Sequence, residues 1–137
     1  MKKKPFDLND PCIFCNPKKE EILAENTYAR IISDNSPVSD GHCLIVPKRH
    51  IKTYFEATVE ENTAFFDLLQ TAKEQIAQQG HKPDGYNIGS NNDVAAGQSV
   101  FHLHIHVIPR YTGDVEQPKG GIRQVLPKKS MYSIKDR

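Results

Sequence analysis

Residues 97–109 read Gly-Gln-Ser-Val-Phe-His-Leu-His-Ile-His-Val-Ile-Pro, so that three histidines alternate with apolar side chains. Successive side chains of a β-strand point to opposite faces of the sheet. A strand here places His102, His104 and His106 on one face and apolar side chains on the other. The whole chain holds only six histidines. Three of them at this spacing favour a functional surface over an ordinary solvated strand face.

The chemistry of this face follows from imidazole and from the residues just upstream. Imidazole can exchange protons near neutral pH, act as a nucleophile or bind a transition metal, and the residues alone leave all three open. Gly97 lets the backbone approach a ligand closely. The Gln98 amide and the Ser99 hydroxyl can donate hydrogen bonds to anionic oxygens. The segment therefore predicts a phosphate site.

Residues 96–110 resemble the signature of the histidine-triad family, nucleotidyl hydrolases and transferases whose pattern is His-apolar-His-apolar-His-apolar-apolar. The similarity extends upstream to Asp34, to residues 41–50 and to residues 86–92, and it covers residues 12–110. It implies an α+β fold that is usually seen as a homodimer with joined sheets. It also implies a nucleotide substrate that is cleaved at its α-phosphate through a covalent nucleotidyl-histidine.

The resemblance implies a role for the histidines that match. His104 matches the nucleophile of the family. His106 and His42 would lie near the α-phosphate and either stabilise its charge or deliver a proton to the leaving group, and the sequence does not divide these roles. The catalytic candidates are His104, His106, His42 and His102.

Four further positions match substrate contacts of the family. Gln98 matches a position at the phosphate or bridging oxygen, and Ser99 one that can reach the leaving group. Asn87 matches a phosphate-side asparagine. Asp34 matches the position that binds ribose hydroxyls, where a carboxylate can accept two hydrogen bonds.

The pair Cys12 and Cys15 forms a Cys-x-x-Cys motif. Such a motif can be redox-active, structural or metal-binding, and zinc is the better interpretation here, but it needs two more ligands. The resemblance supplies His50 and His102, which match a metal site seen in some branches and in the related galactose-1-phosphate uridylyltransferases. The resulting Cys₂His₂ set implies a closed, structural zinc site. No organic cofactor is expected.

Composition bounds the remaining classes. The chain has 137 residues, which suits one domain, and a formal net charge of +1, which does not indicate bulk attraction to nucleic acid or to a membrane surface. No apolar run approaches the ~20 residues that span a bilayer. The odd count of three cysteines argues against a disulfide framework. We expect a cytoplasmic protein that contacts neither nucleic acid nor membrane.

The order of elements predicts an α+β domain: an antiparallel sheet with one long helix packed on it. The β-rich segments 27–33 and 42–46 flank a loop of turn formers and predict an antiparallel pair. Thr58 and Glu61 have capping-box spacing, and apolar residues at helical spacing follow until Gly80. A short strand over 86–91 and the triad strand over 100–108 come next. We expect a mobile arm over residues 1–11, the histidine-triad domain over 12–110, and an extended tail over 111–137, in which Arg123 either grips distal phosphates or is solvated.

The favoured function is a hydrolase or nucleotidyl transferase that acts on a purine nucleotide, either a dinucleoside polyphosphate or a nucleoside phosphoramidate. Two alternatives belong to other classes. One is a metal-binding module whose imidazole face holds a transition metal. The other is a nucleotide sensor without turnover, in which Asp34 and Gln98 matter and His104 does not.

Overall fold

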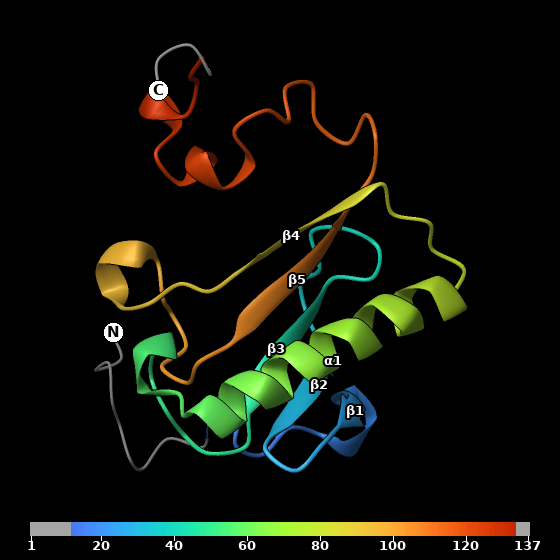
Figure 1. Cartoon of the computed structure of the whole chain (residues 1–137), viewed down its shortest axis with the longest axis vertical. Coiled ribbons are helices and arrows are strands. Elements are labelled where there is room, and N and C mark those ends of the chain that lie inside the picture. Colours follow the sequence, from blue (N-terminus) through green and yellow to red (C-terminus); the bar gives the residue numbers. More distant parts are fainter. Residues whose placement is uncertain (1–11, 134–137) are drawn as a thin grey trace.

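The structure is a computed structural model that describes residues 12–133, so the expected arm at residues 1–11 lies outside the described residues. Among the described residues, five strands form one antiparallel sheet in the order β1-β2-β3-β5-β4, and one long helix covers one face (Figure 1). This confirms the expected α+β fold. The elements are β1 (Ile22–Glu25), β2 (Ala29–Ser33), β3 (Cys43–Pro47), α1 (Val59–Gln78), β4 (Gly85–Gly89) and β5 (Ile105–Arg110).

Strand pairing brings the two histidine-bearing segments together. The strands β2 and β3 pair antiparallel, from Ala29 opposite Pro47 to Ser33 opposite Cys43, as the turn formers between them predict. The strand β3 then pairs with β5, so that Cys43 lies opposite Val107. His42 directly precedes β3. It therefore reaches the same end of the sheet as the histidines of β5.

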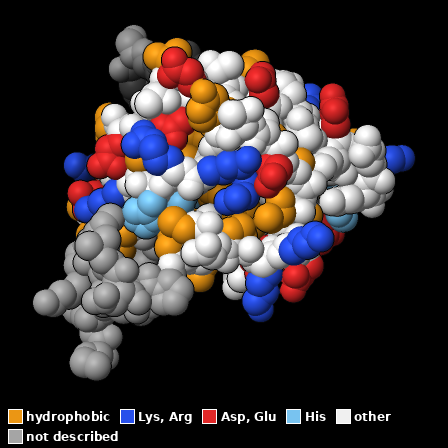
Figure 2. All heavy atoms as spheres, turned by 90° about the horizontal axis from the view of Figure 1, so that it is seen from below, with side chains coloured by type: hydrophobic (Ala, Val, Ile, Leu, Met, Phe, Trp, Pro, Cys, Tyr) orange, Lys and Arg blue, Asp and Glu red, His pale blue; other side chains and the backbone are white. Residues whose placement is uncertain are grey.

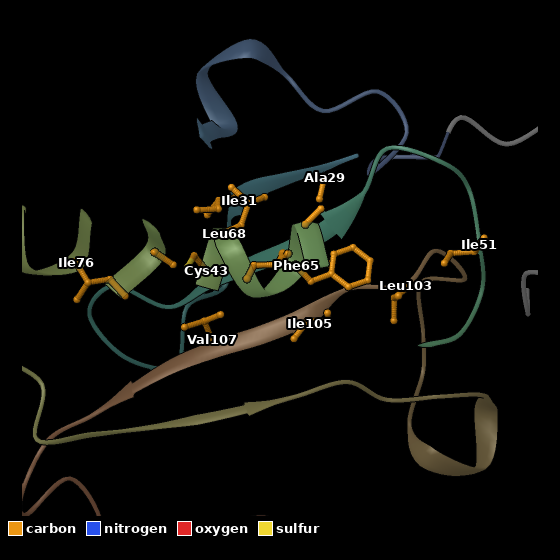
Figure 3. Packing of buried hydrophobic residues seen from close by; sticks show 13 residues of the cluster. Ala29, Ile31, Cys43, Ile51, Phe65, Leu68, Ile76, Leu103, Ile105 and Val107 are labelled. Carbon is orange, nitrogen blue, oxygen red and sulfur yellow. The ribbon is translucent and has the colours of Figure 1, made fainter. Parts of the chain in front are cut away.

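Helix α1 begins with the predicted capping box. The Thr58 side chain accepts a hydrogen bond from the Glu61 N–H, and the Glu61 carboxylate accepts one from the Thr58 N–H. These contacts satisfy donors that the first turn of a helix otherwise leaves unpaired. The apolar stripe of the helix packs on the sheet, which makes it core as predicted (Figure 3). Its buried apolar members are Ala64, Phe65, Leu68, Ala72 and Ile76.

The opposite face of the sheet carries a second, smaller apolar cluster. Phe14 lies between Cys12 and Cys15 in the chain. It packs with Ile32, Leu44 and Val46. These strand residues alternate with the ones that face the helix, as a pleated sheet requires. The N-terminal part of the described chain thus lies on the face of the sheet that α1 leaves open.

Several boundaries differ from the sequence prediction. The strand β1 was not expected, and the triad strand begins at Ile105 rather than at residue 100. The tail is not wholly irregular, since it forms the short 3₁₀ helices η4 (Gly121–Val125) and η5 (Pro127–Lys129). Short 3₁₀ turns need only i to i+3 hydrogen bonds, which a segment rich in Gly and Pro can still make. The tail returns to β4, where Ile122 approaches Gly89.

The surface carries mixed charge. Figure 2 shows Lys, Arg, Asp and Glu side chains interspersed on the face in view, with histidine side chains reaching the surface among them. No helix of residues 12–133 is both long enough and apolar enough to cross a lipid bilayer.

Candidate functional site

The three triad histidines share the face of the sheet opposite helix α1. Leu103, Ile105 and Val107 belong to the core cluster beneath the helix. The period-two alternation that the sequence predicts is therefore present from residue 102 onward, although regular pairing starts only at Ile105. The environments of the three imidazoles nevertheless differ from one another.

His104 is buried, and one of its ring nitrogens is committed. Its Nδ1 lies 2.9 Å from the backbone carbonyl oxygen of His102. A carbonyl oxygen only accepts hydrogen bonds, so Nδ1 carries the proton of the neutral ring and Nε2 carries the lone pair. Within the described part of the chain, Nε2 makes no hydrogen bond. Phe14 packs beside the ring, with ring centroids 5.0 Å apart.

His42 and His106 form a hydrogen-bonded pair. The backbone N–H of Val38 donates to Nδ1 of His42 at 3.0 Å, which places the proton of the neutral His42 ring on Nε2. That Nε2 lies 2.9 Å from Nδ1 of His106 and donates to it. The neutral His106 ring therefore carries its proton on Nε2. The Val38 contact fixes the tautomer of His42, and the tautomer of His106 follows as long as His42 donates to it.

His104 and His106 thus differ at Nε2: that of His104 carries a lone pair, and that of His106 carries a proton. The rings of His104 and His106 lie 5.3 Å apart between centroids, so a lone pair and an N–H donor are presented side by side. Burial lowers the pKa of both His42 and His106, with Asp34 acting in the opposite direction on each. A nucleophile beside a proton donor is the arrangement that displacement at a phosphorus centre requires.

Asp34 lies directly beside this pair. Its Oδ2 is 3.3 Å from Nε2 of His42, and its Oδ1 accepts a hydrogen bond from the backbone N–H of Ser36 at 2.7 Å. Sequence reasoning assigned Asp34 to ribose hydroxyls and missed its contact with His42. The signal was present, because Asp34 and His42 flank the loop between two strands that were expected to pair.

Gln98 is buried, and its side-chain amide is used within the protein. Its Oε1 accepts a hydrogen bond from the N–H of Asp93 at 2.7 Å, and its Nε2 donates to the carbonyl oxygens of Lys52 at 2.7 Å and Val100 at 3.1 Å. The amide therefore braces the loop that leads to the triad. Ser99, the next residue, is exposed. Phosphate contacts by both residues stay predictions.

Asn87 lies on β4, opposite Ile108 of β5 and next to the tail. Its Oδ1 accepts a hydrogen bond from Nη1 of Arg110 at 2.7 Å, and Gly121 of the tail approaches its Nδ2. Arg110 in turn pairs with Asp114 at 2.8 Å. Asn87 therefore already has a charged hydrogen-bond partner, Arg110. Its contact with a phosphate stays a prediction.

Arg123 is engaged inside the tail. Its Nε and Nη2 donate to the carbonyl oxygens of Ser130 and Lys129, and its guanidinium lies over the ring of Tyr132 at 4.7 Å. These contacts fold the tail on itself. A grip of Arg123 on distal phosphates would require some of them to be released.

A second cluster contains the four predicted metal ligands, Cys12, Cys15, His50 and His102, whose ligand atoms all lie within 4.8 Å of one another. Cys15 Sγ is 3.1 Å from Nδ1 of His50 and 3.4 Å from Nδ1 of His102. Cys12 Sγ is 3.5 Å from Nδ1 of His102, and the two Nδ1 atoms are 3.1 Å apart. The structure thus brings together four residues from three distant segments, as predicted.

Comparison with known proteins decides the family. The model of the HIT domain matches residues 16–113. The chain belongs to the HIT family. An uncharacterised HIT-like protein of Methanocaldococcus jannaschii is 40% identical over 80% of this chain and 87% of its own length. The adenosine 5′-monophosphoramidase of Schizosaccharomyces pombe is 34% identical over 72% of this chain and 74% of its own.

Solved structures agree with this assignment to the HIT family. The crystal structure of a zinc-bound histidine triad family protein from Mycobacterium smegmatis superposes with a TM-score of 0.67. It is 31% identical, and the match covers 77% of this chain and 79% of that one. The family resemblance stated from residues 96–110 and the fold expected from it are confirmed.

In this HIT protein the cluster of Cys12, Cys15, His50 and His102 fits a metal ion. A tetrahedral zinc ion, with Zn–S of about 2.3 Å and Zn–N of about 2.0–2.1 Å, separates its ligand atoms by about 3.3–3.8 Å. The distances given above are close to that range. In addition, Nε2 of His102 donates to the carbonyl oxygen of Pro47 at 2.8 Å, which leaves Nδ1 with its lone pair directed at the thiols. Burial lowers the pKa of His102 to about 4, so the ring is neutral near pH 7.

The ligand-type atoms of Asp34, His42 and His106 also lie within 4.8 Å of one another. Their protonation does not suit a metal. Because the Val38 N–H holds Nδ1 of His42 as an acceptor, Nε2 of His42 carries a proton and has no lone pair to offer. Among residues 12–133, the HIT protein therefore has one cluster suited to a metal and one suited to proton transfer.

Proposed function

We propose that this HIT protein is a nucleotide hydrolase or nucleotidyl transferase that cleaves at the α-phosphate of a purine nucleotide through a covalent intermediate on His104. The substrate is a dinucleoside polyphosphate or a nucleoside phosphoramidate. The observation that carries the proposal is the hydrogen bond from Nδ1 of His104 to the carbonyl oxygen of His102, 2.9 Å long. It leaves the lone pair on Nε2, which makes no hydrogen bond to any of residues 12–133.

In the first step, the lone pair on Nε2 of His104 attacks the α-phosphorus. The P–N bond forms as the bond to the leaving group breaks, and the leaving group keeps that electron pair and takes up a proton. His106, next to His104, is placed to donate a proton to the departing oxygen or nitrogen when its ring is cationic, so that the donation leaves a neutral ring. Splitting one displacement into two through a covalent intermediate lowers the barrier of each.

In the second step, water attacks the phosphorus of the nucleotidyl-histidine and releases the mononucleotide. His106 then acts as the base that accepts the proton of the attacking water, which restores the starting state. The buried site strengthens hydrogen bonds to the charged phosphate oxygens, because the local dielectric is low. Asp34, Asn87, Gln98 and Ser99 are proposed to bind the substrate.

The names of relatives support a hydrolase of this kind. The Schizosaccharomyces pombe relative is an adenosine 5′-monophosphoramidase. A relative at 35% identity from Arabidopsis thaliana is an adenylylsulfatase. Both names describe release of an adenylyl group from a small leaving group. We extend to this chain the shared chemistry, attack at the α-phosphorus, and leave its leaving group to experiment.

Cys12, Cys15, His50 and His102 are proposed to hold a structural zinc ion. Bound zinc would supply a rigid link between the N-terminal segment and the residue whose carbonyl orients His104. The set of four protein ligands leaves no open position for water, which is typical of structural sites. We also propose a homodimer, as the resemblance implies.

The test is a substrate panel with wild type, His104→Ala and, as a matched control, His81→Ala, which changes a histidine outside both clusters. The substrates are diadenosine polyphosphates and an adenosine phosphoramidate, and the nucleotide products are resolved by chromatography. We expect wild type and His81→Ala to release a mononucleotide and His104→Ala to be slower by about 10³-fold or more. The preferred substrate identifies the leaving group.

Other outcomes would overturn the proposal. Tight nucleotide binding without turnover in either wild type or His104→Ala would favour the sensor. More than one metal per chain, with no turnover, would favour the metal-binding module.

A further inference from the structure

The carboxylate of Asp34 faces the hydrogen bond between His42 and His106. Its Oδ2 lies 3.3 Å from Nε2 of His42, and the side chain of Asp34 is only 17% exposed. The same Nε2 is 2.9 Å from Nδ1 of His106. The proton on Nε2 of His42 therefore has two possible acceptors, an imidazole nitrogen and a carboxylate oxygen.

Counting protons shows why two acceptors matter. In the neutral pair, His42 and His106 each hold one proton on Nε2. A neutral imidazole that gave away its only proton would become an imidazolate, which is not accessible near neutral pH. His106 can transfer a proton to a leaving group only if it first holds a second proton, on Nδ1. That proton would point at the N–H of His42 across 2.9 Å.

The conflict has one solution within the geometry. His42 cannot move its proton to Nδ1, because the Val38 N–H already points at that nitrogen from 3.0 Å. A small rotation of the His42 ring turns its Nε2–H from His106 toward Oδ2 of Asp34, which lies 3.3 Å away. The other oxygen of Asp34 is held by the Ser36 N–H at 2.7 Å, so the carboxylate keeps its orientation.

We propose that Asp34 is a positioning residue for proton transfer, whose carboxylate accepts the Nε2–H of His42 when His106 takes up a second proton. The inference rests on the proposed function, in which His106 donates to the leaving group. It adds a second duty to a residue that the family resemblance assigns to ribose binding. A carboxylate has lone pairs for both duties.

The charges around the pair agree with this assignment. His106 is acted on by His104, His42 and Asp34, and of these only the anion favours the protonated form. The neighbours of His106 across the sheet, Leu44 of β3 and Gly89 of β4, carry no charge. For His42, Asp34 is likewise the group that opposes the effect of burial.

The reaction step then balances. The cationic His106 gives its Nε2 proton to the leaving-group atom as the bond to phosphorus breaks, and the electron pair of that bond stays on the leaving group. His106 is left neutral with its remaining proton on Nδ1. When water attacks the covalent intermediate, Nε2 of His106 takes the proton of the water and the cation re-forms.

The test compares Asp34→Asn with Asp40→Asn in the full chain with its metal content unchanged. Asn at position 34 keeps an oxygen to accept the Ser36 N–H, and Asp40 is an exposed carboxylate of the same loop, so each variant loses one negative charge. Ring titrations of His42 and His106 by NMR need no turnover. We expect their midpoints to fall by about one pH unit in Asp34→Asn and to stay in place in Asp40→Asn.

Turnover supplies the second readout. The activity that depends on cationic His106 is lost as pH rises, so the alkaline limb of kcat should move to lower pH by a similar amount in Asp34→Asn alone. Lost ribose binding would instead raise KM without moving the limb. Unchanged NMR midpoints in Asp34→Asn would overturn the role of Asp34. Shifted midpoints in a chain that turns over no substrate would instead count against the proposed function.

A measurement on wild type covers the case in which Asp34→Asn does not fold. Nitrogen-15 shifts of the imidazole rings report which nitrogen is protonated through the titration. We expect Nδ1 of His42 to stay unprotonated while Nδ1 of His106 gains a proton. Protonation of Nδ1 of His42 in place of Nδ1 of His106 would overturn the proposal.

Discussion

The ring nitrogen Nδ1 of His104 lies 2.9 Å from the carbonyl oxygen of His102, and this contact joins the two clusters of the molecule. The ring of His102 reaches the thiols of Cys12 and Cys15, while its backbone oxygen holds His104. The residue that would bind metal therefore also orients the candidate nucleophile. Order in one cluster should affect the other.

The proposed zinc site predicts that replacing its two thiols releases the metal and lowers stability. In Cys12→Ser combined with Cys15→Ser, we expect bound metal to fall from about one equivalent per chain to none, because a serine hydroxyl stays protonated near pH 7 and is a poor zinc ligand. In wild type, zinc at about 100 times its Kd should raise the free energy of unfolding by about 2.7 kcal/mol. Elemental analysis and calorimetry measure both effects.

The control for the metal experiment is His81→Ala, because His81 lies outside both clusters. It should keep the metal and the response to zinc. If the serine double variant responds to zinc as wild type does, the metal lies elsewhere. A fall in kcat of the double variant, with KM little changed, would reflect a displaced His104 rather than lost substrate binding.

The period of two in residues 102–107 predicted the two faces of the triad segment correctly, because alternation is a property of any extended backbone. It could not predict that regular pairing begins only at Ile105. Before Ile105 the backbone N–H of Leu103 donates to the carbonyl oxygen of Ile51, and the ring of His102 contacts Pro47 and Cys15. Contacts between residues so far apart in the chain leave no mark on local periodicity.

The contact between Asp34 and His42 could have been predicted from the sequence. The hydrogen bonds of the Gln98 amide to the backbone of Lys52 and Asp93 could not. A hairpin brings residues that flank its loop together, so the first needed only the pairing of β2 with β3. The second depends on Lys52 and Asp93, which lie in irregular segments. Turn chemistry predicts that such loops exist, but not which carbonyl they present to a distant amide.

Two neighbouring phenylalanines on α1 should respond very differently to truncation. Phe65 is 4% exposed and packs in the core, whereas Phe66 is 60% exposed. We expect Phe65→Ala to lower the free energy of unfolding by about 3–5 kcal/mol, because it leaves a cavity. Phe66→Ala should cost less than about 1 kcal/mol. Urea denaturation measures both, and equal losses would mean that the outer face of α1 is covered in solution.

Replacing Glu61 should test the start of α1 and its pH dependence. Its carboxylate accepts hydrogen bonds from Nη2 of Arg49 at 2.7 Å and from the N–H of Thr58 at 3.0 Å. Glu61→Gln should lower the free energy of unfolding at pH 7 by about 1.5–3 kcal/mol, since hydrogen bonds to a charged group are lost. Glu60→Gln, one position away and exposed, is the matched control.

The pH dependence of the Glu61 effect has a definite sign. The Arg49 guanidinium lowers the pKa of Glu61 below its ordinary value of 4.5 in the folded protein. The unfolded chain therefore takes up the proton first as pH falls. The stabilisation by Glu61 is fully present above about pH 4.5 and is lost as pH falls further, so the gap between wild type and Glu61→Gln should close in acid. A gap that stays constant to low pH would contradict the ion pair.

Gln98→Ala should separate a bracing role from a substrate contact. Removing the amide leaves the Asp93 N–H and the Lys52 carbonyl without their side-chain partner, and Asp93 already has a backbone φ of 78°. Asp93 is exposed and Lys52 is half-buried, so water can partly replace the lost partner, and denaturation should show a loss of about 0.5–1.5 kcal/mol. The exposed neighbour Ser99, changed to Ala, should leave stability within about 0.5 kcal/mol.

Kinetics on the same Gln98 variants complete the separation. If the amide only braces the loop, Gln98→Ala lowers kcat/KM by a similar factor for every leaving group, because His104 and its surroundings lose order together. If the amide also binds phosphate, the loss should grow with the number of phosphates in the substrate. Gln98→Glu sharpens the contrast, since it keeps an acceptor for the Asp93 N–H, loses both donors and adds a negative charge. A larger loss in Gln98→Glu than in Gln98→Ala, seen for polyphosphates but not for the phosphoramidate, would place the amide at the distal phosphates.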